Sequence, residues 1–479
     1  MTQRLIVASN RGPVSWSRDA DGARTAVRGS GGLVTALGGA LQSEEGTWVS
    51  VALDADDREV AAEHRGEAFE VEADGARLTL RLLDVGERYD PYYNEVANRM
   101  LWFTVHGLWG EPYEPRGLGW RDAWDAYRSV GEDVARAVVA AAGDAEDVEV
   151  HMQDYHLCTA ATAVRDALPR ARILHYLHTP WVGPSELRRL PDPVAQGVMR
   201  GLLAADVVAV SSPTWAHAFR RGAAEVAHAH VDGDEVWLDG HRVLVADFVL
   251  GVDSDQLDEM GASAQTAEAA RWIEDRCGDR ALILRVDRTD LSKNILRGLH
   301  AFELLLERHP EHRDRVWHYA HLTPSRQGVE EYRAYLAACE RAAQRIAERF
   351  GEACITLAAT DHYPTAIAAF QRSDVLLTNP VRDGTNLVAK EGPILNRRDG
   401  VLVLGRDAGA ADVLADGALM VNAYDVEDQA DALHTALTMA PQERAERAEA
   451  LRTGARRGAP AEWFAAQRAT LRAATTPRV

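Results

Sequence analysis

A ten-residue stretch in the second half of the chain, VDRTDLSKNI (286–295), carries two cations, Arg288 and Lys293. The 479-residue chain has 53 Lys plus Arg, yet only two of them are lysines, Lys293 and Lys390. An arginine fork next to a compact ammonium is typical of a clamp on a diphosphate. A solvated loop is the alternative, but the rarity of lysine favours a selected role for Lys293.

The segment VRDGTNLVAKEG (381–392) leads from a polar loop into a predicted helix. Asp383 precedes a glycine in a tight turn, and Asn386 is placed to cap the helix. Free amides and the dipole at a helix start make an anion site, and Glu391 is placed to hold a ribose diol. The alternative is a well-capped helix whose Lys390 is solvated.

Polar residues also follow the predicted strands of the first half. Gly31 and Gly32 stand in RGSGGLVTAL, a glycine-rich helix start that lets a phosphate approach the backbone, although a flexible loop is equally compatible. Asp154 in QDYHL and His178 in LHTP end neighbouring strands, where a carboxylate and an imidazole can bind sugar hydroxyls. A His–Asp capping pair is the alternative for these two.

The elements that position these residues are short apolar strands alternating with Ala-rich amphipathic segments, which predicts an α/β fold with parallel sheets. Strands are predicted at 4–9, 148–152, 172–178 and 206–211, and again at 281–286, 316–322, 354–358, 374–379 and 401–405; helices at 121–142, 155–168, 295–308 and 327–349; and hairpin strands within 231–247. Two strand series predict two doubly wound Rossmann-like domains, 1–255 and 256–479, with ligands bound beyond the strand ends in the cleft. The last helix, about 459–475, is expected to pack back on the N-terminal domain.

Composition excludes several classes of protein. The net charge of −20 argues against binding to nucleic acid or to an anionic membrane surface. No stretch has the roughly 18 apolar residues of a membrane span. Four scattered cysteines show no zinc-ligand spacing and indicate a reducing compartment, so the expected location is cytoplasmic and no metal ligands are predicted. The sequence leaves room for a homodimer without determining the oligomeric state.

A series of motifs places the chain near a known family. SNRGPVS, GGLVTAL, PYYNEVANRMLW, QDYHL, LHTP, VDRTDLSK, HLTPSR, RDGTNLVAKE and GVLVLGRDAGAADVL resemble, in this order, the trehalose-6-phosphate synthase family of retaining glycosyltransferases, over about residues 3–455. The resemblance implies the GT-B fold, in which two Rossmann-like domains face each other across a cleft. It also implies small-molecule substrates, a nucleotide-activated donor and a phosphorylated acceptor, with neither a tightly bound cofactor nor an essential metal.

The resemblance further implies a role for each matching residue. Those implied for the donor nucleotide are Gly31, Gly32, Arg288, Lys293, Asn386, Leu387, Val388 and Glu391. Those implied for the acceptor phosphate are Arg11, Tyr93, Trp102 and Arg326, and those implied for catalysis are Asp154, His178, Arg288, Lys293 and Asp383.

Several segments depart from the usual family pattern while the diphosphate and phosphate residues are kept. They are TWVSVALD (47–54), the stretch 179–182, SSPTWAHAF (211–219), Leu291, Asn294 and Thr385. Taken as changes around the donor ring, they predict a pseudoglycosyltransferase that couples GDP-valienol to validamine 7-phosphate through nitrogen, with retention, giving validoxylamine A 7′-phosphate and GDP. The alternatives are synthesis of trehalose 6-phosphate from a nucleotide glucose and glucose 6-phosphate, or a non-catalytic phosphosugar sensor.

Overall fold

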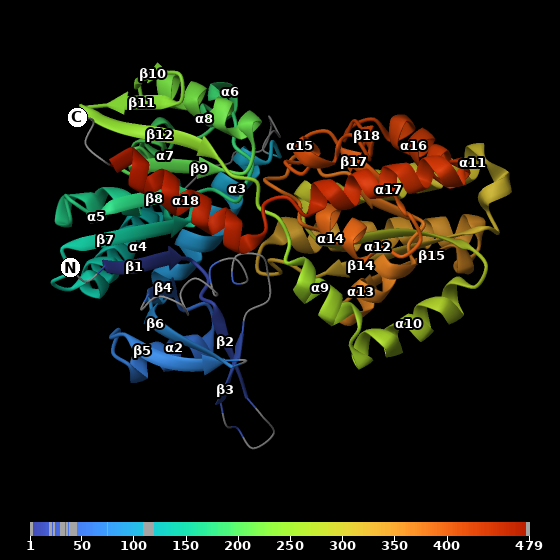
Figure 1. Ribbon diagram of the computed structural model, residues 1–479, viewed down its shortest axis with the longest axis horizontal. Helices are drawn as coiled ribbons and strands as arrows, with labels where there is room; N and C mark the ends of the chain where they lie inside the picture. Colours follow the sequence, from blue (N-terminus) through green and yellow to red (C-terminus); the bar gives the residue numbers. More distant parts are fainter. Residues whose placement is uncertain are drawn as a thin grey trace. The chain divides into compact units, whose positions relative to one another are not determined.

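The structure is a computed structural model that describes residues 3–18, 22, 24–28, 34, 37, 46–73, 75–108 and 119–475. Its backbone contacts divide the chain into unit 1, Met1–Phe248 with Pro460–Val479, and unit 2, Val249–Ala459 (Figure 1). The division lies a few residues before the boundary at 255 that was inferred from the sequence. The reason is that strand β12 (His241–Asp247) completes the sheet of unit 1, and the chain leaves that sheet directly afterwards.

Unit 1 is built on a ten-stranded sheet with a parallel centre and antiparallel edges. Its order is β10 (His230–Asp232), β11 (Glu235–Leu238), β12, β9 (Val207–Val210), β8 (Arg172–Tyr176), β7 (Asp147–Gln153), β1 (Gln3–Ser9), β4 (Thr47–Val51), β6 (Ala76–Leu83) and β5 (Phe69–Ala73). The hairpin strands predicted within 231–247 are β11 and β12. A separate ribbon pairs β2 (Val14–Arg18) with β3 (Arg24–Arg28). The central strands β7 and β9 are almost wholly buried, as expected of parallel strands covered on both faces.

Helices of unit 1 include α2 (Ala55–Glu63), a π-helix η2 (Pro91–Leu101), α3 (Trp102–Val105), α4 (Trp120–Ala142), α5 (Ala160–Ala167), α6 (Pro184–Leu187), α7 (Asp192–Leu202), α8 (Pro213–Val226) and α18 (Pro460–Thr475). Helix α18 lies along β8 and β9, as Figure 1 shows in red. There the buried Glu149 of β7 accepts hydrogen bonds from Arg468 Nε at 2.6 Å and from His151 Nε2 at 2.9 Å. The helix predicted from 155 begins only at Ala160, after a separate 3₁₀ turn η3 (Tyr155–Leu157).

Unit 2 contains a six-stranded parallel sheet in the order β15 (Ile355–Ala359), β14 (Val316–Thr323), β13 (Ala281–Arg288), β16 (Val375–Thr378), β17 (Val401–Gly405) and β18 (Leu419–Val421). This is the doubly wound order: all six strands run parallel, and the order in which the chain adds strands to the sheet reverses between β13 and β16. Ligands of such sheets bind at that switch point, beyond the carboxyl ends of the two strands. This fold therefore predicts a ligand site at the loops after Arg288 and Thr378.

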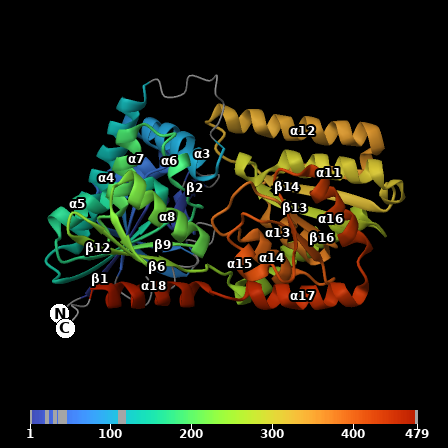
Figure 2. The ribbon, with the colours of Figure 1, turned by 90° about the horizontal axis from the view of Figure 1, so that it is seen from above.

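Two helical layers cover the sheet of unit 2. Ile283 packs under α11 (Ile295–Arg308), α12 (Glu330–Phe350) and α16 (Val426–Thr438). Leu282 and Leu284 point to the opposite layer, which contains α9 (Ser254–Gly261), α10 (Ala264–Cys277), α13 (Tyr363–Arg372), α14 (Val388–Leu395), α15 (Ala411–Leu414) and α17 (Pro441–Ala455). Figure 2 shows α11 and α12 on one side of the unit and α17 on the other. Among the described residues, no helix has the length and apolar character needed to cross a membrane.

Candidate functional site

The switch point of unit 2 brings together residues from two loops that lie about ninety positions apart in the chain. Lys293 ends the short 3₁₀ helix η4 (Leu291–Lys293), and its Nζ lies 2.5 Å from Oδ2 of Asp383. Asn386 donates from Nδ2 to the same carboxylate oxygen at 3.1 Å, while its Oδ1 accepts from the Ala389 amide at 3.1 Å. Asn386 thus joins the Lys293–Asp383 pair to the first turn of α14. Arg288 is the exposed last residue of β13.

A group of buried polar side chains around Arg285 holds the loop that carries Lys293. Arg285, which is fully buried, forms an ion pair with Asp287 at 2.8 Å, donates to the Lys293 carbonyl at 3.0 Å, and also bonds Oδ1 of Asn379. Burial raises the pKa of Asp287 to about 6, although the Arg285 charge opposes the shift. The amide of Asn379 donates in turn to Gln429 Oε1 at 2.6 Å. These residues were not predicted from the sequence, in which their signal was a charged pair in the otherwise apolar strand ALILRVDR.

Asn294 follows Lys293 in the left-handed backbone conformation, with φ at 59°. Glycine and asparagine adopt this conformation most readily, so an asparagine suits the backbone path at this position. The side chain of Asn294 adds bonds from Nδ2 to the carbonyls of Asn379 at 2.9 Å and Ala423 at 2.6 Å. Asn294 therefore shapes the backbone of the loop that carries Lys293, and its interpretation as a sign of a changed donor ring stays a prediction.

Helix α14 contains Lys390 and Glu391 in unlike environments. Lys390 is fully buried and donates from Nζ to the Leu250 carbonyl at 2.7 Å, so the alternative of a solvated Lys390 is wrong. Burial lowers the pKa of Lys390 to about 8, with the Arg457 charge adding to the effect. Burial raises the pKa of Glu391 to about 7, although a hydrogen bond with Tyr363 opposes the rise. Glu391 therefore changes its charge near neutral pH.

Arg326 lies, within unit 2, against the loop 289–294 that carries Lys293, which we call the clamp loop. Its guanidinium donates to Oδ2 of Asp290 at 2.6 Å and to the Tyr332 hydroxyl at 2.8 Å. Asp290 is itself buried and accepts from the Ser292 amide at 3.0 Å, which starts η4. The residue predicted to hold an acceptor phosphate is thus coupled, through Asp290, to the loop that carries Lys293.

In unit 1, Asp154 follows β7 with φ at 70° and ψ at 173°, a conformation that residues other than glycine rarely adopt. Its carbonyl accepts from His175 Nε2 at 2.9 Å, and its Oδ1 accepts from the His178 amide at 3.2 Å. The His178 ring contacts Gln153 Oε1 through Nε2 at 2.9 Å. Burial, reinforced by His175, lowers the pKa of His178 to about 3, so its imidazole is neutral at physiological pH. Strain of roughly 1–3 kcal/mol at Asp154 is typical of functional sites.

Two of the predicted acceptor residues surround the loop that begins at Asp154. Tyr93, on the π-helix, stacks on His156 with ring centres 5.6 Å apart. Trp102 is buried with its ring 5.5 Å from Tyr155. The π-helix was not foreseen, and such helices occur frequently at functional sites.

Arg11 is exposed in a loop that buried contacts hold in place. Its carbonyl accepts from Ser9 Oγ at 2.6 Å, and that hydroxyl accepts from Trp48 Nε1 at 2.7 Å. The neighbouring Asn10 accepts from the Tyr92 hydroxyl at 2.8 Å, which ties the loop to the π-helix. Trp48 belongs to the segment 47–54, which departs from the family pattern, and its hydrogen bond to Ser9 supports the loop that carries Arg11. Gly31 and Gly32 lie outside the described residues.

Two further departing segments pack against each other in the core of unit 1. Trp181, from the stretch 179–182, is buried with its ring 5.6 Å from that of Phe219, in the segment 211–219. The two segments therefore contribute to one aromatic contact of the core, and their interpretation as signs of a changed donor ring stays a prediction. Two other residues that depart from the family pattern, Leu291 and Thr385, stand two positions along the chain from Lys293 and Asp383.

The comparisons with known proteins agree with this geometry. The model of Glycosyltransferase family 20 matches residues 3–473. A trehalose-6-phosphate synthase of Mycolicibacterium vanbaalenii is 35% identical over 471 residues, which cover 94% of this chain and 91% of the relative. An alpha,alpha-trehalose-phosphate synthase [UDP-forming] of Botryotinia fuckeliana is 30% identical, with 92% of this chain and 84% of the relative covered. The chain spans 60% of a bifunctional trehalose-6-phosphate synthase/phosphatase of Thermoproteus tenax, at 32% identity over 94% of this chain.

Solved structures give the same result. The Escherichia coli structure described as trehalose-6-phosphate bound with UDP-2-fluoro glucose superposes with a TM-score of 0.84 at 25% identity, covering 99% of this chain and 100% of the other. The Burkholderia xenovorans alpha,alpha-trehalose-phosphate synthase (UDP-forming) in complex with glucose-6-phosphate gives 0.83 at 27% identity, covering 98% and 100%. The predicted GT-B fold is confirmed by these structures. Because the family match spans nearly the whole chain, the protein belongs to glycosyltransferase family 20.

Proposed function

We propose that this chain is a trehalose-6-phosphate synthase, which transfers glucose with retention from a nucleotide glucose to glucose 6-phosphate. The observation that carries the proposal is the similarity along more than nine-tenths of the chain to proteins with this name. UDP-glucose is the proposed donor, because the Botryotinia relative is named UDP-forming. The GDP-linked donor predicted from the sequence has no such support.

Unit 2 would bind the donor. Arg288 and Lys293 would stabilise the negative charge that develops on the diphosphate as it leaves, together with the amides of Leu387 and Val388 at the start of α14. Asp383 would orient the Lys293 ammonium, which it contacts at 2.5 Å, and contact the donor ring. The group of buried polar side chains around Arg285 would keep the loop that carries Lys293 rigid, so that little reorganisation is needed during the reaction.

The acceptor phosphate would be bound by Arg11, Tyr93 and Trp102, with Arg326 as a further cation. Asp154 would bind the acceptor hydroxyls. The bond between the sugar carbon and the diphosphate oxygen breaks, and the acceptor hydroxyl oxygen attacks the same face of the cationic ring. The leaving phosphate takes the hydroxyl proton, so no enzyme nucleophile is required. His178, being neutral, would contact the donor ring without adding a charge near the cation.

The C–N coupling hypothesis rests on the departing segments alone, whereas the names of the relatives favour synthesis of trehalose 6-phosphate. It remains testable alongside the main proposal. The purified chain is incubated with UDP-glucose or GDP-glucose plus glucose 6-phosphate, and separately with GDP-valienol plus validamine 7-phosphate, and the products are identified by mass spectrometry. Trehalose 6-phosphate in the first mixture supports the proposal. A C–N product alone would replace it, and substrate binding without any product would indicate a sensor.

A further inference from the structure

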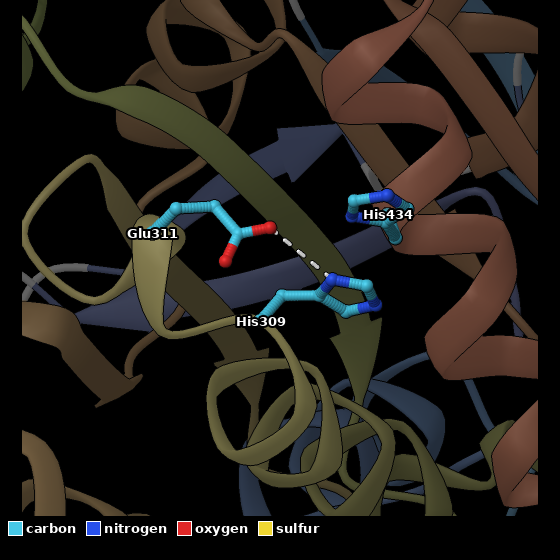
Figure 3. A group of neighbouring side chains, drawn as sticks. All are labelled: His309, Glu311 and His434. Carbon is cyan, nitrogen blue, oxygen red and sulfur yellow. Dashed lines mark hydrogen bonds and ion pairs between the residues drawn. The ribbon is translucent and has the colours of Figure 1, made fainter.

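Three metal-ligating side chains meet on unit 2 outside the candidate site. His309 follows α11, Glu311 lies in the next turn η5 (Pro310–His312), and His434 projects from α16 (Figure 3). One donor atom from each lies within 4.8 Å of the others. The group is at the opposite end of α11 from Lys293, and a helix of fourteen residues is roughly 21 Å long. It is therefore separate from the proposed donor loops.

The spacing of the donor atoms suits a tetrahedral transition metal. His309 Nδ1 and Glu311 Oε1 are 3.3 Å apart. Bonds of about 2.0–2.1 Å in a tetrahedron place neighbouring ligand atoms roughly 3.3 Å apart. The rings of His309 and His434 stack with centroids 3.6 Å apart and an angle of 12°. In this stack the two ring planes are nearly parallel, so binding of one ion requires the His309 and His434 rings to turn apart until both planes pass through the ion.

A fourth residue, the buried His312, contacts the ring of His434. Its Nε2 lies 3.1 Å from Nδ1 of His434, which leaves Nε2 of His434 to coordinate. Ligating imidazoles almost always bond a second group through their other ring nitrogen, which fixes the ring orientation. His312 is thus a positioning residue for His434.

We propose that His309, Glu311 and His434 form a binding site for Zn²⁺, with water in the fourth position. Two imidazoles and a carboxylate suit zinc, whereas Mg²⁺ and Ca²⁺ prefer oxygen ligands throughout. The ion joins the end of α11 to α16, segments about 120 positions apart in the sequence. Its role is to stabilise unit 2, and it takes no part in the proposed sugar transfer.

The test uses the full chain without a histidine tag, stripped of metal and dialysed against ZnCl₂. Bound zinc is measured by mass spectrometry and its affinity by calorimetry, and Co²⁺ is added separately to record the visible spectrum of a tetrahedral site. The variants are His309→Ala, His434→Ala and Glu311→Gln. His300→Ala is the matched control, because His300 is an exposed histidine of the same helix α11.

Wild type and His300→Ala are expected to bind one zinc per chain. The His434→Ala and His309→Ala variants should bind zinc at least about tenfold more weakly, and Glu311→Gln, whose side chain is exposed, removes a ligand without disturbing the core. Zinc at about one hundred times the wild-type dissociation constant should raise the melting temperature of wild type by roughly 5 °C and that of His309→Ala by at most about half as much. Equal zinc binding by wild type and all three variants, or no binding by wild type, overturns the proposal, whatever the transferase assay gives.

Discussion

Replacing Lys293 by alanine tests the assignment of the donor clamp. The Lys293 and Asp383 side chains are only 14% and 13% exposed, and their charged atoms are 2.5 Å apart. The variant removes the cation that Asp383 contacts, so in the proposed donor complex the Asp383 carboxylate would face the diphosphate without it. Losing one preorganised charged donor at a developing negative charge costs about 3–4 kcal/mol in the transition state. We therefore expect kcat/KM to fall by roughly 10²- to 10³-fold.

The assay is release of UDP at saturating glucose 6-phosphate, with circular dichroism and urea unfolding as checks on the fold. Lys293→Arg keeps the charge but replaces a compact ammonium by a wide planar group, so it should restore only part of the activity. Arg308→Ala is the matched control. Arg308 is the last residue of α11, the helix that follows Lys293, and it forms an exposed ion pair with Glu427 of α16. If folded Lys293→Ala keeps kcat/KM within about threefold of wild type, the clamp assignment is wrong.

Four further predictions concern stability, pH and metal. Burial alone would raise the pKa of Glu149, but hydrogen bonds from His151 and Arg468 outweigh it and lower the pKa to about 2. Glu149→Gln should therefore lower the free energy of unfolding at pH 7 by about 3 kcal/mol in urea titrations. Wild type should lose the same contribution only as the pH falls from about 4.5 towards 2. Equal urea midpoints for the two proteins at pH 7 would contradict this. Asn294→Gly and Asn294→Val both lose the two buried hydrogen bonds of the Asn294 amide, but only valine is strained by the positive φ, so the valine variant should be less stable than the glycine variant by roughly 1–3 kcal/mol. Thermal unfolding compares them, and equal stability of the two variants would refute the backbone argument. If the ionised Glu391 accepts the ribose hydroxyls as proposed, the donor KM should fall as the pH rises through about 7. Glu391→Gln should then flatten that profile in initial-rate measurements. EDTA should leave kcat unchanged in the UDP-release assay while lowering the melting temperature through loss of zinc, and a loss of kcat would show that the reaction needs a metal.

Much of the fold could be predicted from local sequence, because strand and helix periodicity are properties of short segments. The alternation of apolar strands with amphipathic helices predicted two parallel sheets, and the polar residues at strand ends predicted where ligands would bind. Lys293, Asp383 and Asn386 were named separately and meet in the structure, since the carboxyl ends of parallel strands share one edge of a sheet. The helix predicted from 155 began late because Asp154 leaves its strand in a conformation that periodicity does not encode.

The meaning of individual substitutions required the tertiary structure. Asn294 stood out in the sequence only as a departure from the family pattern, and its φ of 59° showed that the position demands a left-handed backbone. Trp181 and Phe219 looked like two independent departures until their rings were found in contact. Each depends on a neighbour or a dihedral angle that a one-dimensional pattern does not contain.

By itself, the sequence determined the fold class, the order of the elements and which residues stand at the strand ends. Only the tertiary structure decided that Lys390 is buried, that Arg285 and Asn379 support the clamp from below, and that His434 joins His309 and Glu311. The physical reason is the range of the interactions. Periodicity and turn chemistry act over a few residues, whereas burial and side-chain pairing depend on segments that come together only when the sheets and their covering helices pack.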